Sequence, residues 1–326
     1  MLDLSAEIET FPLLRPFTIS RGTKTETIVV TATVSSGDIV GRGECGPNAR
    51  YEETPESVLD DILTVAPNVK VGLDRVGLRD ILPPGAARNA IDCALWDFEA
   101  KAAGRPVWSL MGADAPAPVE TAFTLSAAGP DDMSREAAAN ADRPLLKLKL
   151  TGSGDLDRVR AVRKQAGDAR LIVDANESWD AEIYCEIVPA LADLGVELIE
   201  QPFPATEDGV LADLDRPVAV CADESFHDSS SLAGLQDKYD VVNIKLDKTG
   251  GLTEAMSASR AARSAGFRVM VGCMVGTSLA MAPAMLVAQQ AEFVDLDGPL
   301  LLATDREPGL EVHRSTIMPP RSELWG

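Results

Sequence analysis

The chain has 326 residues, of which 45% are hydrophobic, so it is long enough to bury a large core and to form more than one domain. Its formal net charge of −21 argues against a nucleic-acid partner and against an anionic membrane surface, because both need a positive field. No apolar run reaches the length of about 18 residues that a membrane span needs. The N-terminus lacks signal-peptide features, and the five scattered cysteines show neither a disulfide framework nor metal-ligand spacing. We therefore expect a cytoplasmic protein with reduced thiols.

The N-terminal third predicts a small α+β unit. Two β-branched runs, Thr27–Ser35 and Ile39–Cys45, flank a Ser-Gly-Asp turn and are typical of a hairpin. A helix is expected around Glu56–Val65, and Ala86–Ala103 places apolar residues at helical spacing before a glycine. We assign residues 1–110 to this unit.

From residue 119 the pattern changes to strands that alternate with helices such as Leu156–Gln165 and Leu252–Ala265. The predicted strands are Val119–Leu125, Leu145–Lys149, Leu171–Asp174, Val196–Glu200, Val218–Ala222, Val241–Lys245, Arg268–Cys273 and Phe293–Asp297. Eight strands within residues 111–299 predict an α/β barrel. Residues 300–326 show no further repeat and are expected to pack back on the N-terminal unit.

Five consecutive strands of this barrel end on charged residues at a nearly constant interval. From Lys149 the steps are 25, 26, 23 and 22 residues, about one strand, one helix and two loops each. The charged residues on these strands are Lys147, Lys149, Asp174, Glu200, Asp223 and Lys245. Because parallel barrel strands all end at one face, these side chains are expected to form a single site.

The lysines predict acid–base chemistry on two sides of one substrate. Lys147 and Lys149 are two residues apart on a strand and point to the same face, so burial and mutual repulsion are expected to lower a lysine pKa toward the range of a general base. Lys245 ends the sixth strand, which lies opposite the second in an eight-stranded barrel. Amines on both sides of a carbon can remove a proton from one face and return one to the other, which inverts a stereocentre.

The carboxylates predict a metal site. Asp174, Glu200 and Asp223 end three successive strands, and three converging carboxylates repel each other unless a cation binds them. Hard oxygen ligands favour Mg²⁺ over Zn²⁺, and such an ion stabilises a carbanion next to a carboxylate as an enolate. Glu224 and Asn176 lie close to these ligands in the sequence and are expected to support them.

The eighth strand carries two further acids on one face, Asp295 and Asp297. This strand lies opposite the fourth, in the middle of the metal group, so the far end of a bound substrate would meet negative charge. The pair therefore favours a cationic group on the substrate, such as an ammonium. From spacing alone, a solvated acidic loop explains the two residues equally well.

At these residues the sequence resembles the enolase superfamily, in its muconate-lactonizing-like subgroup. The most specific resemblance is to the dipeptide epimerases of the L-Ala-D/L-Glu type, which act in murein-peptide metabolism. The matching motifs are KLKL (147–150), LIVDANESW (171–179), EQP (200–202), CADES (221–225), VNIKLDKTGGLTEA (242–255), DLDGP (295–299) and GAARNAIDCALWDFEA (85–100). The resemblance covers nearly the whole chain. It implies a modified TIM barrel of the (β/α)7β type, whose mouth is covered by an α+β capping domain that the C-terminal tail completes.

The resemblance also implies the reaction and its catalytic residues. The enzyme would be an isomerase that inverts the Cα of the C-terminal residue of a dipeptide. Lys149 and Lys245 would be the two acid–base catalysts, with Lys147 tuning Lys149. One Mg²⁺ ion would be held by Asp174, Glu200 and Asp223.

The same resemblance implies how the dipeptide is bound. Its α-ammonium would bind Asp295 and Asp297, which agrees with the position of the eighth strand. A loop of the capping domain over residues 19–24 would contact the C-terminal side chain. Within this loop, Arg21 would pair with a glutamate γ-carboxylate.

Other functions remain open from the sequence. An o-succinylbenzoate synthase, an N-succinylamino-acid racemase or a muconate cycloisomerase would use the same lysines and metal, and the Asp295–Asp297 pair alone argues against them. A non-catalytic peptide-binding protein is a further alternative, although no lysine or acid of the pattern is missing. The expected partner is a small dipeptide, with no nucleic acid and no membrane, and the sequence allows a homo-oligomer.

Overall fold

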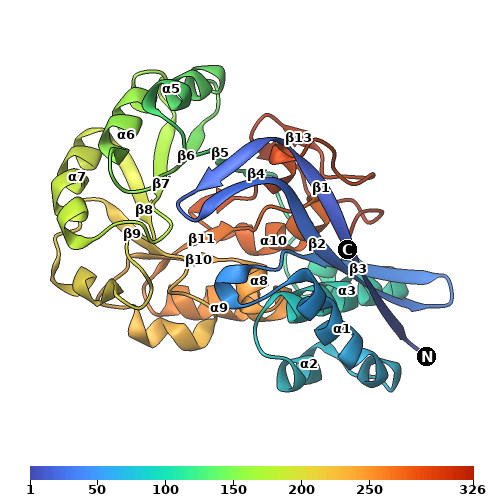
Figure 1. The fold of residues 1–326 in the computed structure, drawn as a ribbon. Helices are drawn as coiled ribbons and strands as arrows, with labels where there is room; N and C mark the ends of the chain where they lie inside the picture. Colours follow the sequence, from blue (N-terminus) through green and yellow to red (C-terminus); the bar gives the residue numbers. More distant parts are fainter.

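The computed structural model describes residues 1–326, which form three β-sheets and ten α-helices (Figure 1). One sheet is antiparallel and N-terminal, one has eight parallel strands, and the third is a small sheet near the C-terminus. No helix of the chain combines the length and the apolar character that crossing a bilayer demands.

The N-terminal sheet is a meander in which β2 lies between β1 and β3. Its strands are β1 (Asp3–Ile19), β2 (Gly22–Ser36) and β3 (Ile39–Cys45). The predicted hairpin is confirmed as the β2–β3 pair, in which Val30 lies opposite Cys45. The long strand β1 has no counterpart in the prediction. Leu4 is its one buried residue, so its sequence lacks a clear alternation of apolar and polar residues, and its register with β2 shifts after Pro12. Such a proline is tolerated because β1 is an edge strand.

Three helices accompany this sheet: α1 (Pro55–Lys70), α2 (Arg75–Ile81) and α3 (Ala86–Ala103). Helix α1 begins at a capping box, in which the side chains of Thr54 and Ser57 each accept from the other residue's backbone N–H. Helix α3 has the predicted bounds and ends at Gly104, whose φ of 61° is left-handed. Apolar residues of α1 and α3 form one core with β2 and β3.

The predicted barrel is confirmed. Its parallel strands, in spatial order, are β5 (Phe123–Leu125), β6 (Leu145–Lys149), β7 (Arg170–Asp174), β8 (Val196–Glu200), β9 (Ala219–Ala222), β10 (Val241–Ile244), β11 (Arg268–Gly272) and β12 (Phe293–Asp295). The first and last strands approach each other, because Ala122 N donates to Val294 O at 2.8 Å. The helices that follow the strands are α5 (Pro130–Ala139), α6 (Asp155–Arg163), α7 (Ala181–Asp193), α8 (Leu246–Thr249), α9 (Leu252–Ser264) and α10 (Ser278–Ala288). After β8 and β9 the α-helix is replaced by a 3-10 helix, η2 (Asp208–Asp213) and η3 (Ser229–Gly234) respectively.

The first predicted barrel strand is wrong in its bounds. It breaks into β4 (Val119–Glu120), which leaves the barrel, and β5, which belongs to it. The third sheet is completed by β13 (Val312–His313) and β14 (Thr316–Ile317) from the C-terminal segment. This segment also reaches helix α3, where Trp325 Nε1 donates to Cys93 O at 3.0 Å. The division of the chain at residues 110 and 300 stays a prediction.

Candidate active site

The barrel interior consists of an apolar layer beneath a polar one. The apolar layer is a single cluster of Ala122, Leu145, Ile172, Leu198, Cys221, Val241, Met270 and Phe293. Two residues further along each strand the side chains point the same way, which gives Thr124, Lys147, Asp174, Glu200, Asp223, Asn243, Gly272 and Asp295. The strands therefore bring the predicted charged residues together at their carboxyl ends, above a sealed apolar floor.

Lys147 is the most deeply buried of the predicted lysines, with 1% of its surface exposed. Its Nζ lies 2.6 Å from Glu200 Oε2, 2.7 Å from Asp295 Oδ2 and 3.2 Å from Asp174 Oδ2. These three carboxylates come from β7, β8 and β12, so the ammonium group joins both sides of the polar layer. It cannot leave this position without exposing three buried charges to each other.

Lys149 and Lys245 stand on either side of the acids of β7, β8 and β9. Lys149 Nζ lies 2.5 Å from Asp174 Oδ2, and Lys245 Nζ lies 2.7 Å from Asp223 Oδ2. The structure places Lys245 one residue beyond β10, as the first residue of the turn into α8. Lys149 and Lys245 are 9% and 6% exposed, so both are more accessible than Lys147.

The expected decrease in lysine pKa is wrong for Lys147. Burial by itself lowers the pKa of Lys147, but Asp295, Glu200 and Asp174 outweigh it and raise this pKa well above its ordinary value. Burial likewise lowers the pKa of Lys245, whereas Asp223 and Glu200 raise it above the ordinary value. The prediction counted the lysine neighbours and neglected the acids on the adjacent strands, which lie closer.

The three acids on β7–β9 fit a hard cation by their chemistry and their burial. Asp174 and Glu200 are register partners on neighbouring strands, and Asp223 follows β9 directly. Burial and then the Asp174 charge raise the pKa of Glu200 to about 7, although Lys147 Nζ lies 2.6 Å from Glu200 Oε2. Ammonium groups contact these carboxylates, and no three acids, histidines or cysteines lie together as a metal-ligand cluster. The oxygen donors suit Mg²⁺.

Asp295 and Asp297 lie together at the far side of the polar layer. Thr124 connects them, since its N–H donates to Asp297 Oδ2 at 2.6 Å and its hydroxyl to Asp295 Oδ1 at 3.4 Å. Burial and then Asp295 raise the pKa of Asp297 to about 7. The alternative of a solvated acidic loop is wrong, because both residues are buried.

Arg21 brings the β1–β2 turn onto the barrel mouth. Its Nη2 donates to Glu224 Oε1 at 2.8 Å, and its Nη1 donates to Asn176 O at 3.2 Å. Glu224 therefore contacts the capping loop, while the Asn176 backbone N–H donates to Asp174 Oδ1 at 2.9 Å. Both residues thus lie beside the acids, as expected, and Arg21 remains about one-third exposed.

Family models match two long segments of the chain. A model described as "Mandelate racemase / muconate lactonizing enzyme, N-terminal domain" matches residues 5–112, and one described as "Enolase C-terminal domain-like" matches residues 132–321. The chain belongs to the enolase superfamily. The resemblance found in the sequence is thereby confirmed, together with the TIM-barrel fold.

Two superfamily members of known activity are similar over most of their length. The L-Ala-D/L-Glu epimerase of Escherichia coli (strain K12) is 46% identical over 305 residues, which cover 93% of this chain and 95% of that protein. An N-acetyl-D-glutamate racemase of a Pseudoalteromonas species is 42% identical over 300 residues, which cover 91% of this chain and 95% of that protein.

Two solved structures are similar to this chain over nearly its whole length. An enolase family member from Agrobacterium tumefaciens with homology to dipeptide epimerases has a TM-score of 0.98 and 51% identity, covers 100% of both chains, and contains sodium and L-Ala-L-Glu with an ordered loop. A dipeptide epimerase from Enterococcus faecalis V583, complexed with Mg and L-Leu-L-Tyr, has a TM-score of 0.90 and 28% identity over 98% of this chain and 96% of that one.

Two further residues that contact these acids are absent from the prediction. Asn243 Nδ2 donates to Glu200 Oε1 at 2.9 Å, and Lys248 Nζ donates to Asp223 Oδ1 at 2.6 Å. Asn243 lies two residues before Lys245, so the strand period alone indicates that it faces the site. Lys248 lies in the one-turn helix α8, which has no counterpart in the sequence pattern.

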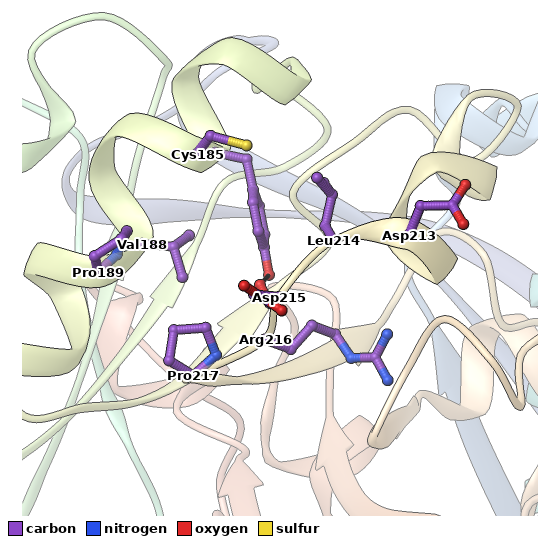
Figure 2. A pocket seen from close by; sticks show the side chains of 9 residues that line it. Cys185, Val188, Pro189, Asp213, Leu214, Asp215, Arg216 and Pro217 are labelled. Carbon is purple, nitrogen blue, oxygen red and sulfur yellow. Dashed lines mark hydrogen bonds between the residues drawn. The ribbon is translucent and has the colours of Figure 1, made fainter.

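A hollow of about 730 Å³ lies away from the predicted lysines and acids. Cys185, Val188 and Pro189 of α7 line one side, and residues 213–217 line the other (Figure 2). The second segment precedes β9, so the hollow is at the opposite end of the strands from the lysines. No predicted site residue lines it.

Proposed function

We propose that this enolase-superfamily chain is an isomerase, an Mg²⁺-dependent dipeptide epimerase that interconverts L-Ala-L-Glu and L-Ala-D-Glu in murein-peptide metabolism. The observation that carries the proposal is the placement of Lys149 and Lys245 on opposite sides of one row of acids. Lys149 is the last residue of β6 and Lys245 directly follows β10, and these strands are four apart in a barrel of eight. One planar carbon centre between them can therefore exchange a proton on either face.

The lysines divide the proton transfer between them. One takes the Cα proton, and the other, as an ammonium, returns a proton to the opposite face. Lys147 and Lys149 both contact Asp174 Oδ2, at 3.2 and 2.5 Å, so their ammonium groups act on each other at short range. Lys147 keeps its proton, and we propose that it tunes Lys149 through this shared carboxylate.

The residues that would hold Mg²⁺ are Asp174, Glu200 and Asp223. Their oxygen donors, their burial and the magnesium in the Enterococcus faecalis neighbour support this assignment. When bound, the ion supplies a Lewis acid that stabilises the negative charge developing on the substrate carboxylate and adds positive charge beside the lysines. Lys147, Asn243 and Lys248 contact these carboxylates and orient them.

The two ends of the dipeptide would meet opposite charges. Asp295 and Asp297 would accept its α-ammonium, and Asp295 Oδ2 already accepts an ammonium from Lys147 at 2.7 Å. A second cation there favours the charged form of Asp297, whose pKa burial has raised. Arg21 would bind the γ-carboxylate from the capping loop, in exchange for part of its contact with Glu224.

A second candidate is racemisation of an N-acylated glutamate. The 42% identity to an N-acetyl-D-glutamate racemase favours it, since that substrate shares the glutamate carboxylates and the acidic Cα hydrogen. It carries no ammonium, so it leaves Asp295 and Asp297 without a cationic partner from the substrate. We therefore rank it below the dipeptide reaction.

Matched substrates separate the two candidates. The enzyme is incubated with Mg²⁺ in D₂O with L-Ala-L-Glu, L-Ala-D-Glu, N-acetyl-L-glutamate or N-acetyl-D-glutamate, and the Cα–H signal is followed by NMR. We expect deuterium at the glutamate Cα and interconversion of the two dipeptides, with N-acetylglutamate reacting about 5- to 150-fold more slowly, because a buried polar group left without its substrate partner costs about 1–3 kcal/mol. Faster reaction of N-acetylglutamate than of both dipeptides would contradict the proposal.

The cellular setting is part of the proposal. All five cysteines are free thiols, which is consistent with the reducing conditions of the cytoplasm. We place the enzyme in that compartment, where dipeptides from murein breakdown are available. Assembly into a homo-oligomer stays a prediction.

A further inference from the structure

The segment that follows Lys245 is held by the N-terminal part of the chain. Lys245 O accepts hydrogen bonds from Lys248 N and Thr249 N, each at 3.0 Å, so Lys245 is fixed to the turn of α8. Gly250 and Gly251 then lead directly into α9. Helix α3 lies against this segment from outside the barrel (Figure 1).

Arg88 of α3 binds the end of that turn. Its Nη2 donates to Thr249 O at 2.6 Å, and its Nε donates to Gly250 O at 3.1 Å. The residue is 5% exposed, and its third hydrogen bond, from Nη1 to Leu82 O at 3.2 Å, anchors it to the segment before α3. A planar guanidinium thus connects two carbonyl groups of the Lys245 turn to the capping part of the chain.

Two further residues of α3, Asn89 and Asp92, bind both sides of the glycine pair. Asn89 Nδ2 donates to Asp247 Oδ1 at 2.8 Å, before the glycines. Asp92 accepts from Thr253 Oγ1 at 2.6 Å and from Thr253 N at 3.0 Å, after them. Together with the two carbonyl groups that Arg88 binds, these contacts hold the segment from residue 247 to residue 253 against one helix.

The close approach of the helix explains why the segment contains two glycines. A Cβ at Gly250, where φ is +76°, would lie 2.3 Å from Arg88 Nε, and one at Gly251 would lie 2.5 Å from Asp92 Cβ. No larger residue fits between the helix and the segment unless one of them moves. The contact is thus a packed one, which transmits displacement of α3 to the turn.

Lys149 is held in a different way. The turn after β6 binds Asp155 of α6, through Thr151 N at 3.0 Å and Gly152 N at 2.8 Å. Asp155 in turn accepts from Trp179 Nε1 at 2.7 Å, so all these partners belong to the barrel. None of the hydrogen bonds of α3 reaches residues 123–179. The two proposed bases therefore have independent supports.

From this asymmetry we infer that Arg88, Asn89 and Asp92 are positioning residues for Lys245, and that helix α3 sets the rate of proton transfer on the Lys245 face alone. The inference rests on the proposed two-base reaction. A displacement of Lys245 Nζ of about 1 Å lowers proton transfer by about 10- to 100-fold, whereas Lys149, on the other face, keeps its geometry.

The test measures Cα exchange from each epimer separately. Wild type, Lys245→Ala, Arg88→Lys and Asp92→Asn are each given L-Ala-L-Glu or L-Ala-D-Glu in D₂O with excess Mg²⁺, and initial loss of the Cα–H signal is recorded. The Lys245→Ala variant identifies the epimer whose hydrogen faces Lys245. Glu99→Gln is the matched control, because Glu99 lies on α3 but binds Arg75 instead of the Lys245 segment.

We expect Arg88→Lys and Asp92→Asn to lower exchange of the Lys245-facing epimer at least about 10-fold and that of the other epimer by less than about 2-fold. Glu99→Gln should leave both rates unchanged. Equal losses from both epimers, or a selective loss in Glu99→Gln, overturn the inference. So do unchanged rates in both folded variants. If wild type exchanges neither epimer, the proposed function itself is wrong, which distinguishes the two failures.

Discussion

Asp247 is a buried carboxyl group near the acids Glu53 and Glu44. Its Oδ1 accepts from Asn89 Nδ2 and from Gly46 N at 3.1 Å, yet burial, assisted by the charges of Glu53 and Glu44, raises its pKa to about 7. The unfolded chain has the ordinary pKa near 3.8. The native state therefore holds this proton more tightly than the unfolded state does between about pH 4 and pH 7.

Ionisation of Asp247 therefore lowers the stability of the folded protein as the pH rises. Because the folded pKa is raised, the free energy of unfolding falls from about pH 4 to pH 7 and then stays low. Asp247→Asn keeps both hydrogen bonds to Oδ1 and removes the ionisation. We expect it to be about 2–4 kcal/mol more stable than wild type at pH 8 and nearly equal at pH 4, as measured by urea unfolding. A difference that does not change with pH would rule out this account.

The three lysines show which features of the site the sequence pattern predicts and which it does not. That Lys147, Lys149 and Lys245 meet the acids of the neighbouring strands follows from strand period and barrel order. The direction of the pKa shifts of Lys147 and Lys245 does not follow, since it depends on distances of 2.6–3.2 Å to nearby acids that no sequence spacing contains. Asn243 could have been predicted from the strand period, whereas Lys248 depends on the path of a single helical turn.

At the scale of elements, the junction between α8 and α9 depends on a glycine for two separate reasons. Gly250 has a left-handed φ, and its neighbour Arg88 leaves no room for a side chain. Gly195, between α7 and β8, has a similar φ of +72°, but a Cβ added there would meet no atom within 4 Å. Substitution of Gly195 therefore tests backbone strain alone, whereas substitution of Gly250 tests backbone strain together with steric collision.

We expect Gly195→Ala to lower the free energy of unfolding by about 1 kcal/mol, which is the cost of the left-handed conformation. Gly250→Ala should cost about 2–5 kcal/mol, because the collision with Arg88 is added. Chemical denaturation of the two variants measures the difference. Equal losses would mean that α3 and the segment adjust freely, which contradicts a rigid contact between them.

Helices and strands were predicted correctly where apolar residues recur with one clear period. Helix α3 and the β2–β3 hairpin carry strong periodic patterns, and both are confirmed. Strand β1 is largely exposed and contains prolines, so its sequence has little of the alternation that identifies a strand. The split of the first barrel strand into β4 and β5 depends on pairing with β14, almost 200 residues away in the chain, which local sequence does not contain.

At the scale of the whole molecule, the barrel alone does not complete the site. The β1–β2 turn places Arg21 over the mouth, and α3 holds the segment behind Lys245. Arg306 of the C-terminal segment also binds Glu44 of β3, at 2.8 Å from Nε to Oε2, and Glu9 of β1. The superfamily barrel was predictable from its repeat, but these long-range contacts were not, because each joins segments without any shared periodicity.

The central claim is that two lysines on opposite faces carry out one inversion. Lys149→Ala and Lys245→Ala test it most directly when each variant is given L-Ala-L-Glu and L-Ala-D-Glu separately in D₂O with Mg²⁺. We expect both variants to lose epimerisation. Residual Cα exchange should survive with one epimer in Lys149→Ala and with the opposite epimer in Lys245→Ala. Equal residual exchange from both epimers in either variant would contradict the two-base account.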